Sequence, residues 1–297
     1  MSRPRKMAIA VTFFYRAERL AFLSQTAESF PELAEEVAVW IVTDRNDESI
    51  HAEIREAVPI ENMRVVSPSL LGHPYLLPWC HQSVFKELFD TDDSYSHFLY
   101  MEDDLAISRN NIEYWMRAEQ KLSPLGLIPG FMRFEERPDG ARVSSDVYRV
   151  HNYHDMARVE GPDYAYVNFR YPYQGMYLMN RSMMGEFMAG SGSGPDHGPW
   201  KIRESATQGL IWRNVPPGCF SRSFVGYKRG IGVDDAALIH HLPNNYANSP
   251  TKYGSLTLDS LVRENTLRVT PFMKDVGRMW SFRLPKARKL LMETLEP

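Results

Sequence analysis

The chain has little cysteine, little net charge and no long hydrophobic run. Only two of its 297 residues are cysteines, Cys80 and Cys219, which form neither a CxxC pair nor a disulfide framework, and this favours a reducing compartment. The formal net charge of −3 gives no global signal for nucleic-acid binding. No stretch is apolar enough to span a membrane, and the basic N-terminus precedes only a strand-length apolar run, unlike a signal peptide. We therefore expect a cytoplasmic protein that is at most peripheral to a membrane.

Two common nucleotide-binding motifs are also absent. No GxGxxG follows the first apolar run, and GxxxxGK[ST] occurs nowhere, which argues against a dinucleotide-binding Rossmann site and a P-loop. The segment Gly190–Gly198 is rich in glycine, but no GK[ST] follows it. We interpret it either as a lid or acceptor-side loop, or as a flexible loop without a function.

The first half of the sequence alternates strand-like and helix-like segments. Short apolar runs predict buried strands, and apolar residues at helical spacing lie between them. We expect strands at 7–15, 37–43, 63–66 and 97–102, and helices at 20–30, 79–89 and 111–122. Pro31 is expected to stop the first helix, and Asn110 or Asn111 to cap the third. This order predicts an α/β fold with a mostly parallel central sheet flanked by helices.

The second half is less regular and predicts a mixed arrangement. Strands are expected at Leu127–Glu135 and Arg142–Tyr148, followed by a helix whose methionines face inward. No repeat or low-complexity linker interrupts the chain, so we predict a single domain. Its parts are a nucleotide-binding half at 1–125, a second half at 126–252 and a helical tail at 253–297. The basic, amphipathic end of that tail, Gly277–Pro297, is either a closing helix packed on the body or a contact with an anionic membrane.

Three consecutive carboxylates end the fourth predicted strand. Residues 97–104 read HFLYMEDD, so Glu102, Asp103 and Asp104 follow directly on an apolar run. Ligand and catalytic groups of open α/β sheets collect at the carboxyl ends of strands. Crowded carboxylates repel one another unless a cation offsets them, and oxygen ligands suit Mg²⁺ or Mn²⁺. The alternative is an acidic, solvated loop after a core strand.

Polar and aromatic residues also follow the first two predicted strands. Thr12, Phe14 and Arg16 end the first strand, and Asp44 ends the second. Phe14 could stack on a base, Asp44 could accept a hydrogen bond from a base or ribose, and Arg16 could meet a diphosphate. Alternatively, Asp44 caps a turn and Arg16 is a solvated residue at a helix start.

The run Tyr100–Asp104 at the end of a buried strand resembles the DXD motif of GT-A nucleotide-sugar glycosyltransferases. In many members of this class the motif reads EDD. The resemblance covers about the first 120 residues by order of elements. It implies a GT-A-like fold, a nucleotide-sugar donor, by default a UDP-sugar, and a glycan or glycolipid acceptor. Asp104 would hold the divalent cation, Mn²⁺ or Mg²⁺, against the donor diphosphate, while Glu102 and Asp103 contact the metal shell or the donor.

The resemblance also implies a general base about 100 residues beyond the DXD-like triplet. Glu204 is our candidate, because inverting GT-A enzymes often place a carboxylate at the start of a helix after the acceptor strands. Here Ser205 follows Glu204, whereas the usual pattern has two adjacent acidic residues. A glutamate stabilised by a helix N-terminus is the structural alternative, and other carboxylates that could serve are Asp234, Asp235 and Asp196.

A histidine pair lies at the end of a short apolar run near the end of the second half. Many GT-A enzymes return a C-terminal histidine to the metal, and a neutral imidazole is a competent Mn²⁺ ligand. We predict His241 as this ligand, with His240 second. Adjacent strand residues face opposite sides, so only one of them is expected to serve.

Three other classes of function remain open. A sugar-phosphate nucleotidylyltransferase would share the α/β plan and the metal, but should carry a glycine-rich loop after the first strand, and residues 12–20 contain no glycine. A non-catalytic glycan-binding protein or a metal-dependent hydrolase would use the same residues differently. Within a transferase, the aromatic stretch Tyr164–Tyr173 would suit sugar stacking, and residues near Gln174 would help to hold the acceptor. No sequence feature indicates the oligomeric state.

Overall fold

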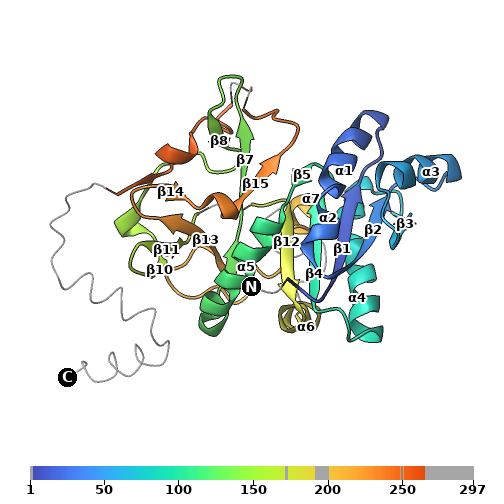
Figure 1. Cartoon of the computed structure of the whole chain (residues 1–297), viewed down its shortest axis with the longest axis horizontal. Helices are drawn as coiled ribbons and strands as arrows, with labels where there is room; N and C mark the ends of the chain where they lie inside the picture. The colour runs from blue at the N-terminus through green and yellow to red at the C-terminus, as the bar shows by residue number, and fades with distance from the viewer. Residues whose placement is uncertain (1–2, 171–172, 191–200, 248, 250, 265–297) are drawn as a thin grey trace.

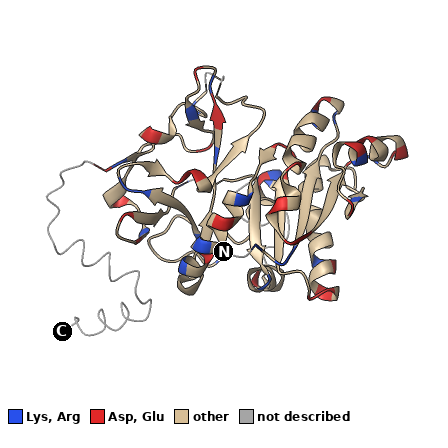
Figure 2. Cartoon of the chain, viewed as in Figure 1, with Lys and Arg blue, Asp and Glu red and all other residues tan. Residues whose placement is uncertain are grey.

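The computed structural model describes residues 3–170, 173–190, 201–247, 249 and 251–264 (Figure 1). Most of the glycine-rich loop Gly190–Gly198, including Asp196, and the basic segment Gly277–Pro297 lie outside the described residues. Within the described part, no helix has the length and apolar character that crossing a bilayer requires. Acidic and basic side chains are interspersed over the described elements, and neither sign dominates one half (Figure 2).

A five-stranded sheet forms the centre of the first half, in the order β12-β4-β1-β2-β3. Its parallel members are β1 (Lys6–Phe13), β2 (Glu36–Thr43), β3 (Met63–Val66) and β4 (His97–Glu102). Seven of the eight residues of β1 are buried, as expected for a strand covered on both faces. The predicted α/β fold with a mostly parallel central sheet is confirmed.

Helices flank this sheet and connect its strands (Figure 1). They are α1 (Leu20–Ala27), α2 (Phe30–Leu33), α3 (Glu48–Ala57), α4 (His81–Thr91) and α5 (Arg109–Leu122), with the 3-10 turns η1 (Ala17–Arg19), η2 (Pro74–Trp79) and η3 (Ser123–Leu125). Pro31 does not end α1, but lies in the first turn of α2, where its missing N–H is not needed. Ser108 caps α5 in a reciprocal capping box with Asn111, so the cap expected at Asn110 or Asn111 lies earlier.

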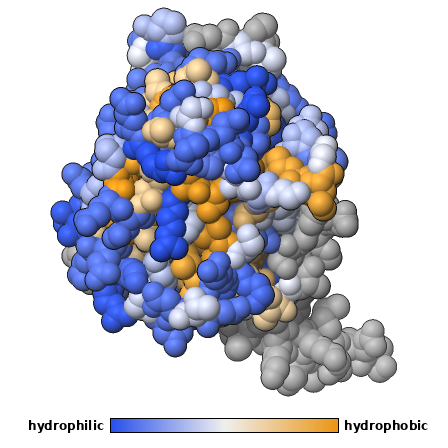
Figure 3. Space-filling model, turned by 90° about the vertical axis from the view of Figure 1, so that its right-hand side faces the viewer, coloured by the Kyte–Doolittle hydropathy of each residue, from blue (hydrophilic) through white to orange (hydrophobic). Residues whose placement is uncertain are grey.

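One strand from the second half completes the first sheet. Strand β12 (Met176–Asn180) pairs antiparallel with β4. The first sheet therefore includes a strand from the sequence that follows the division expected near residue 125. The buried apolar side chains form one continuous cluster through both halves. The side of the molecule that carries α3 is mostly hydrophilic, with an apolar area in a hollow between hydrophilic rims (Figure 3).

The expected strand Leu127–Glu135 is in fact two strands. β6 (Ile128–Gly130) pairs with β13 (Ser223–Lys228), whereas β7 (Met132–Glu136) pairs with β15 (Leu238–His241). Of the expected strand Arg142–Tyr148, only β8 (Arg142–Ser144) is extended in a sheet. The remaining elements are β5 (Leu105–Ala106), β9 (His151–Asn152), β10 (Arg158–Glu160), β11 (Tyr164–Val167), β14 (Gly232–Val233), β16 (Val262–Arg263), α6 (Arg181–Ala189), α7 (Ile202–Ser205), η4 (Tyr153–Asp155), η5 (Asp235–Ala237) and η6 (Leu258–Ser260).

A second sheet, β5-β15-β7-β8, brings distant parts of the chain to the end of β4. Strand β5 begins directly after Asp104 and pairs antiparallel with β15, which places His241 opposite Leu105. The Leu242 N–H donates a hydrogen bond of 2.9 Å to the Asp104 carbonyl. This pairing joins two segments more than 130 residues apart at the acidic triplet.

Candidate functional site

A cavity of about 990 Å³ opens beyond the carboxyl ends of β1 and β4. In parallel α/β sheets this edge is where ligands bind. The lining residues come from both halves of the chain: Thr12, Phe14, Arg16, Arg19, Pro74, Tyr75, Leu77, Pro78, Tyr100, Glu102, Asp103 and Asp104 from the first, and Arg133, Ser145, Asp146, Tyr148, Tyr173, Lys201, Arg203, Glu204, His241, Asn245, Tyr246 and Tyr253 from the second. They include basic, acidic and aromatic side chains.

Asp103 and Asp104 are buried, at 5% and 7% exposure, so the triplet is not a solvated loop. Arg19 holds both carboxylates. Its Nε and Nη2 donate to Asp103 at 2.8 Å each, and Nη2 also donates to Asp104 Oδ2 at 2.9 Å. Burial and the neighbouring Asp104 raise the pKa of Asp103 to about 7 against the influence of Arg19. Burial alone would raise the pKa of Asp104, but the partners His241 and Arg19 outweigh it and lower the pKa to about 2.

His241 lies between two carboxylates. Its Nε2 is 3.5 Å from Asp104 Oδ2, and its Nδ1 donates to Glu135 Oε1 at 2.5 Å. Burial opposes protonation of this imidazole, but the two carboxylates prevail and raise its pKa to about 9. Because β7 alternates its side chains, Glu135 reaches the same face as His241.

The donor set at this point fits a divalent cation. Asp104 Oδ1 is buried and has no hydrogen-bond partner among the described residues. The Glu135 carboxylate holds the Nδ1 proton of His241, which leaves Nε2 as the atom that can ligate, a usual outer-shell arrangement around metal-bound histidine. Among the described residues, no group of three or more His, Cys, Asp or Glu forms a ready-made metal cage. Mg²⁺ is commonly held by one or two carboxylates plus substrate phosphates, so two protein ligands suffice beside a diphosphate.

His240 faces away from this site. Its ring stacks on Phe134 with centroids 4.9 Å apart, and its Nε2 pairs with Asn244 Oδ1 at 3.1 Å. Adjacent residues of β15 thus point to opposite sides, as the strand periodicity requires. Of the two predicted histidine ligands, only His241 reaches the cavity.

Glu102 belongs to a second polar cluster on the cavity floor. Its Oε1 accepts a hydrogen bond of 2.9 Å from the Tyr173 hydroxyl, and its Oε2 lies 3.7 Å from Arg133 Nη1. Arg133, only 4% exposed, donates two hydrogen bonds of 2.9 Å to Asp146, and its guanidinium lies 4.7 Å from the centre of the Tyr173 ring. Burial and Asp104 raise the pKa of Glu102.

Three of the four residues predicted at the ends of β1 and β2 line the cavity. Thr12 Oγ1 donates to the Tyr100 hydroxyl at 3.2 Å, and the Arg16 guanidinium lies 5.3 Å from the centre of the 40% exposed Phe14 ring. Asp44 is not among the cavity residues: its Oδ1 accepts a hydrogen bond of 2.8 Å from the Tyr15 N–H. Asp44 therefore joins the ends of β1 and β2, and its contact with a base or ribose stays a prediction.

Among the proposed base carboxylates that the structure describes, Glu204, Asp234 and Asp235, only Glu204 lines the cavity. It lies in the short helix α7, where Oε1 accepts from Arg203 Nη2 at 3.1 Å, while Oε2 is buried without a partner among the described residues. The alternatives lie elsewhere: Asp234 pairs with Lys228 at 2.8 Å and Asp235 with Arg142 at 2.8 Å.

The two predictions about acceptor contacts stay predictions. In the stretch Tyr164–Tyr173, Tyr173 lines the cavity, whereas Tyr164 hydrogen-bonds Asp234 at 3.0 Å. Gln174 is buried and bonds the Phe131 N–H and the Ser223 hydroxyl, both at 3.0 Å, so it stabilises the fold.

Sequence reasoning missed Arg19, Arg133 and Glu135. The only local signal for two of them was the spacing of Arg133 and Glu135, which places both on one face of a strand. Arg19 carried no signal, because it meets its carboxylate partners 84 and 85 residues further along the chain.

Comparison with known proteins identifies no family for this chain. No protein-family model matches it, and no curated protein matches it. Among solved structures, the chain is similar to 4-diphosphocytidyl-2C-methyl-D-erythritol synthase from Anaerococcus prevotii, with a TM-score of 0.36 and 15% identity over 68% of this chain and 82% of that chain. The activity of this chain is therefore inferred from its own residues.

Proposed function

We propose that this protein is a metal-dependent glycosyltransferase that moves a sugar from a nucleotide-sugar donor to a hydroxyl group of a glycan or glycolipid. The observation that carries the proposal is the pair Asp104 and His241. These residues offer a buried, unpartnered carboxylate oxygen and an oriented imidazole nitrogen at the end of β4. They line the same cavity as Glu204, so the proposed cation site and the candidate base share one cavity.

The donor fits the side of the cavity formed by the first sheet. Phe14 offers an exposed ring for the base, and Arg16 offers a guanidinium for the diphosphate. Lys201 and Arg203 also line the cavity and add positive charge. When bound by Asp104 and His241, Mn²⁺ or Mg²⁺ would neutralise negative charge on the diphosphate leaving group.

Glu204 supplies the acid–base chemistry in this proposal. The acceptor oxygen attacks the anomeric carbon and forms the new glycosidic bond, while the bond from that carbon to the diphosphate breaks and the nucleoside diphosphate departs with the electron pair. Glu204 Oε2, which is buried and unpartnered in the described structure, takes the proton of the acceptor hydroxyl. A base on the acceptor side corresponds to inversion at the anomeric carbon.

Calorimetric titration tests the donor site. UDP and a panel of UDP-sugars are titrated into wild type, Asp104→Asn and the control Asp90→Asn, with and without Mn²⁺. Asp90 is exposed on α4, where it pairs with Lys86. We expect Mn²⁺-dependent binding that Asp104→Asn abolishes and Asp90→Asn retains. If no UDP compound binds, the titration is repeated with GDP, CMP and dTDP compounds. Absence of binding of all four nucleotides to folded protein would contradict the proposal.

A second assay separates the transferase from the nucleotidylyltransferase alternative. A nucleotidylyltransferase combines a nucleoside triphosphate with a sugar phosphate and releases pyrophosphate, whereas the proposed enzyme releases a nucleoside diphosphate. Incubation with each nucleotide and each sugar phosphate, followed by pyrophosphate detection, decides between them. Pyrophosphate release that depends on both substrates would replace our proposal with the alternative.

A further inference from the structure

Three tyrosines form a row along the acceptor side of the cavity. Tyr246 stacks on the His241 imidazole with centroids 5.7 Å apart and planes 24° apart. The Tyr253 ring lies 5.8 Å from Tyr246, and the Tyr148 ring lies 5.7 Å from Tyr253. All three tyrosines line the cavity. We call Tyr246, Tyr253 and Tyr148 the tyrosine row, which leads outward from the proposed cation site.

Hydrogen bonds hold the backbone that carries this row. The Ala247 N–H donates to Glu135 Oε2 at 2.5 Å, which links the row to the carboxylate that orients His241. The Gly254 N–H donates to the Ser144 carbonyl at 3.1 Å. Gly254 has a φ of +69°, and a Cβ there would come within 2.4 Å of the Tyr246 carbonyl oxygen, so glycine allows this close approach. These bonds fix the backbone beside Tyr246 and Tyr253, which lowers the entropic cost of positioning the two rings around a ligand.

We propose that the tyrosine row binds an oligosaccharide acceptor of at least two sugar units, an inference that rests on the proposed function. Sugar rings present apolar C–H faces that pack on aromatic rings, while the tyrosine hydroxyls remain able to hydrogen-bond. Successive ring planes meet at 57° and 84°, so the row offers ring edges and hydroxyls as well as ring faces, over a length that exceeds one sugar unit. The unit nearest His241 presents its hydroxyl to the reacting centre.

Positive charge at the outer end of the row adds a preference for acidic sugars. Lys252 Nζ lies 4.2 Å from the centre of the Tyr148 ring and 5.2 Å from that of Tyr253. The Arg149 guanidinium lies 5.8 Å from the Tyr148 ring centre. Neither cation is among the cavity residues, and Lys252 is the nearer to the row, so a carboxylate or phosphate on the outer sugar would meet the Lys252 ammonium beside the Tyr148 ring. The acceptor class is therefore an acidic oligosaccharide.

Binding to an oligosaccharide array tests this assignment. The array holds neutral oligosaccharides and uronic-acid-containing ones, each as mono-, di- and tetrasaccharides, and the labelled full chain is applied with UDP and Mn²⁺. The variants are Tyr253→Ala, Tyr253→Phe, Tyr148→Leu and Lys252→Gln, with Phe220→Ala as the control. Tyr253 is 37% exposed and Phe220, outside the cavity, is 45% exposed, so the two truncations are comparable.

We expect wild type to bind acidic di- and tetrasaccharides better than monosaccharides. Tyr253→Ala and Tyr148→Leu should lower this binding on the order of tenfold, while Tyr253→Phe and Phe220→Ala retain it. Lys252→Gln should lower binding of acidic but not neutral oligosaccharides. Equal binding of acidic and neutral members would overturn the acidic assignment. Unchanged binding by folded Tyr253→Ala and Tyr148→Leu, or no oligosaccharide binding by wild type, would overturn the tyrosine row as a subsite.

Donor titration of the same proteins separates the two proposals. The tyrosine variants should bind UDP and Mn²⁺ as wild type does, because their rings lie on the acceptor side. If the donor binds normally but the tyrosine substitutions do not change oligosaccharide binding, only the acceptor subsite is overturned. Loss of nucleotide binding from wild type itself contradicts the proposed function.

Discussion

Glu135 joins His241 to the backbone of the tyrosine row through its two carboxylate oxygens. Oε1 accepts from His241 Nδ1 and Oε2 accepts from the Ala247 N–H, each at 2.5 Å. Glu135 is fully buried, so no water competes for these bonds. The orientation of the imidazole and the position of the neighbouring loop therefore depend on the same side chain.

Replacement of Glu135 by Gln should weaken metal binding. A glutamine can accept only through its one oxygen and turns an NH₂ group toward the second donor, so either His241 or Ala247 loses its partner. We expect Mn²⁺ affinity in the presence of UDP, measured by electron paramagnetic resonance, to fall by about 10–100-fold. Glu136→Gln, on the exposed side of the same strand, is the control and should bind as wild type does. Equal affinity in both variants would show that Glu135 does not position the ligand.

Replacement of Glu204 by Gln should affect turnover more than substrate binding. The amide cannot accept the acceptor proton, so we expect kcat to fall by about 10²–10⁴-fold while donor affinity stays close to that of wild type. Steady-state rates with an acceptor that the oligosaccharide array identifies, and donor titration, measure the two effects. The control Asp235→Asn removes an exposed carboxylate that pairs with Arg142 outside the cavity and should leave kcat unchanged. A Glu204→Gln enzyme with full kcat would exclude this residue as the base.

Replacement of Arg19 by Met should destabilise the metal-free protein. Arg19 compensates Asp103 and Asp104, whose side chains are 7% and 10% exposed, so its loss leaves two adjacent buried carboxylates. We expect the free energy of unfolding at pH 7, from urea denaturation, to fall by about 3 kcal/mol. In our proposal Mn²⁺ binds the folded carboxylate site, so added Mn²⁺ should reduce the difference from wild type.

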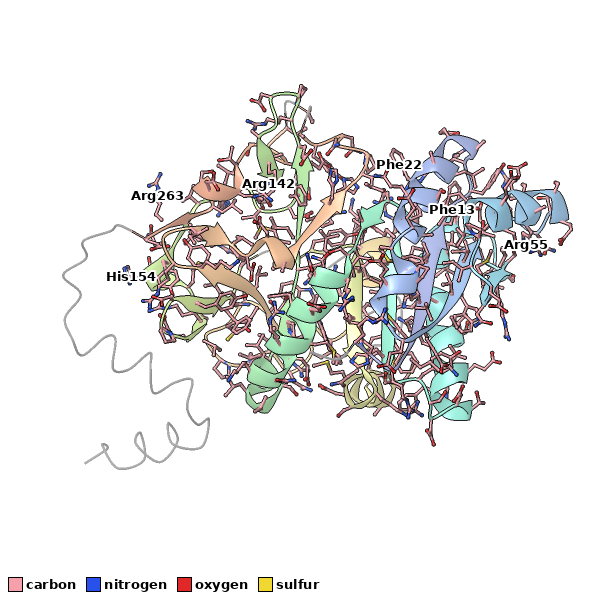
Figure 4. The ribbon with its side chains drawn as sticks, viewed as in Figure 1. Phe13, Phe22, Arg55, Arg142, His154 and Arg263 are labelled. Carbon is pink, nitrogen blue, oxygen red and sulfur yellow. The ribbon has the colours of Figure 1, made fainter. Side chains whose placement is uncertain are left out.

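The surface ion pair of Arg55 with Glu48 provides the control for this loss. Its atoms are 2.6 Å apart, but the side chains are 50% and 78% exposed, and Arg55 projects from α3 at the edge of the molecule (Figure 4). Arg55→Met should cost less than about 1 kcal/mol. Equal losses in the two variants would contradict a special role of the buried carboxylates.

His81 should make the fold sensitive to mild acid. It is fully buried, stacks on Tyr100 and pairs through Nε2 with the Tyr177 hydroxyl at 2.5 Å, and burial lowers its pKa to about 3. The unfolded chain takes up this proton near pH 6.5, so the unfolded state binds more protons between the two pKa values. The stability that neutral His81 contributes is therefore complete above pH 6.5 and is lost progressively as the pH falls toward 3, by up to about 1.4 kcal/mol per pH unit.

Urea denaturation of His81→Gln at pH 7.5 and pH 5 measures this contribution. Glutamine retains a donor and an acceptor but does not titrate, so the loss of stability between the two pH values should be smaller than in wild type. The control His73→Gln replaces an exposed histidine before η2 and should keep the pH dependence of wild type. An unchanged pH dependence in His81→Gln would mean that the buried imidazole is not responsible.

The sequence by itself determined the α/β framework and the place of the acidic triplet. Apolar runs that end in polar residues predicted β1, β2 and β4, because a strand buried on both faces must be apolar along its length. The short edge strand β3 was predicted from its apolar residues, although none of its residues is buried. The position of Glu102, Asp103 and Asp104 at the end of β4 followed from the same local pattern. Strand periodicity also predicted that one histidine of the pair would face away, and the structure identifies it as His240.

Only the tertiary structure decided which polar residues meet at the cavity. Asp44 and Arg19 are both close to strand ends in sequence. Asp44, however, accepts a hydrogen bond from the Tyr15 N–H, whereas Arg19 donates to Asp103 and Asp104 in the cavity. The pairing of β5 with β15 and the position of Glu135 beside His241 join segments more than 100 residues apart. Such contacts depend on how whole elements pack against one another, and hydrophobic periodicity within a segment carries no information about that packing.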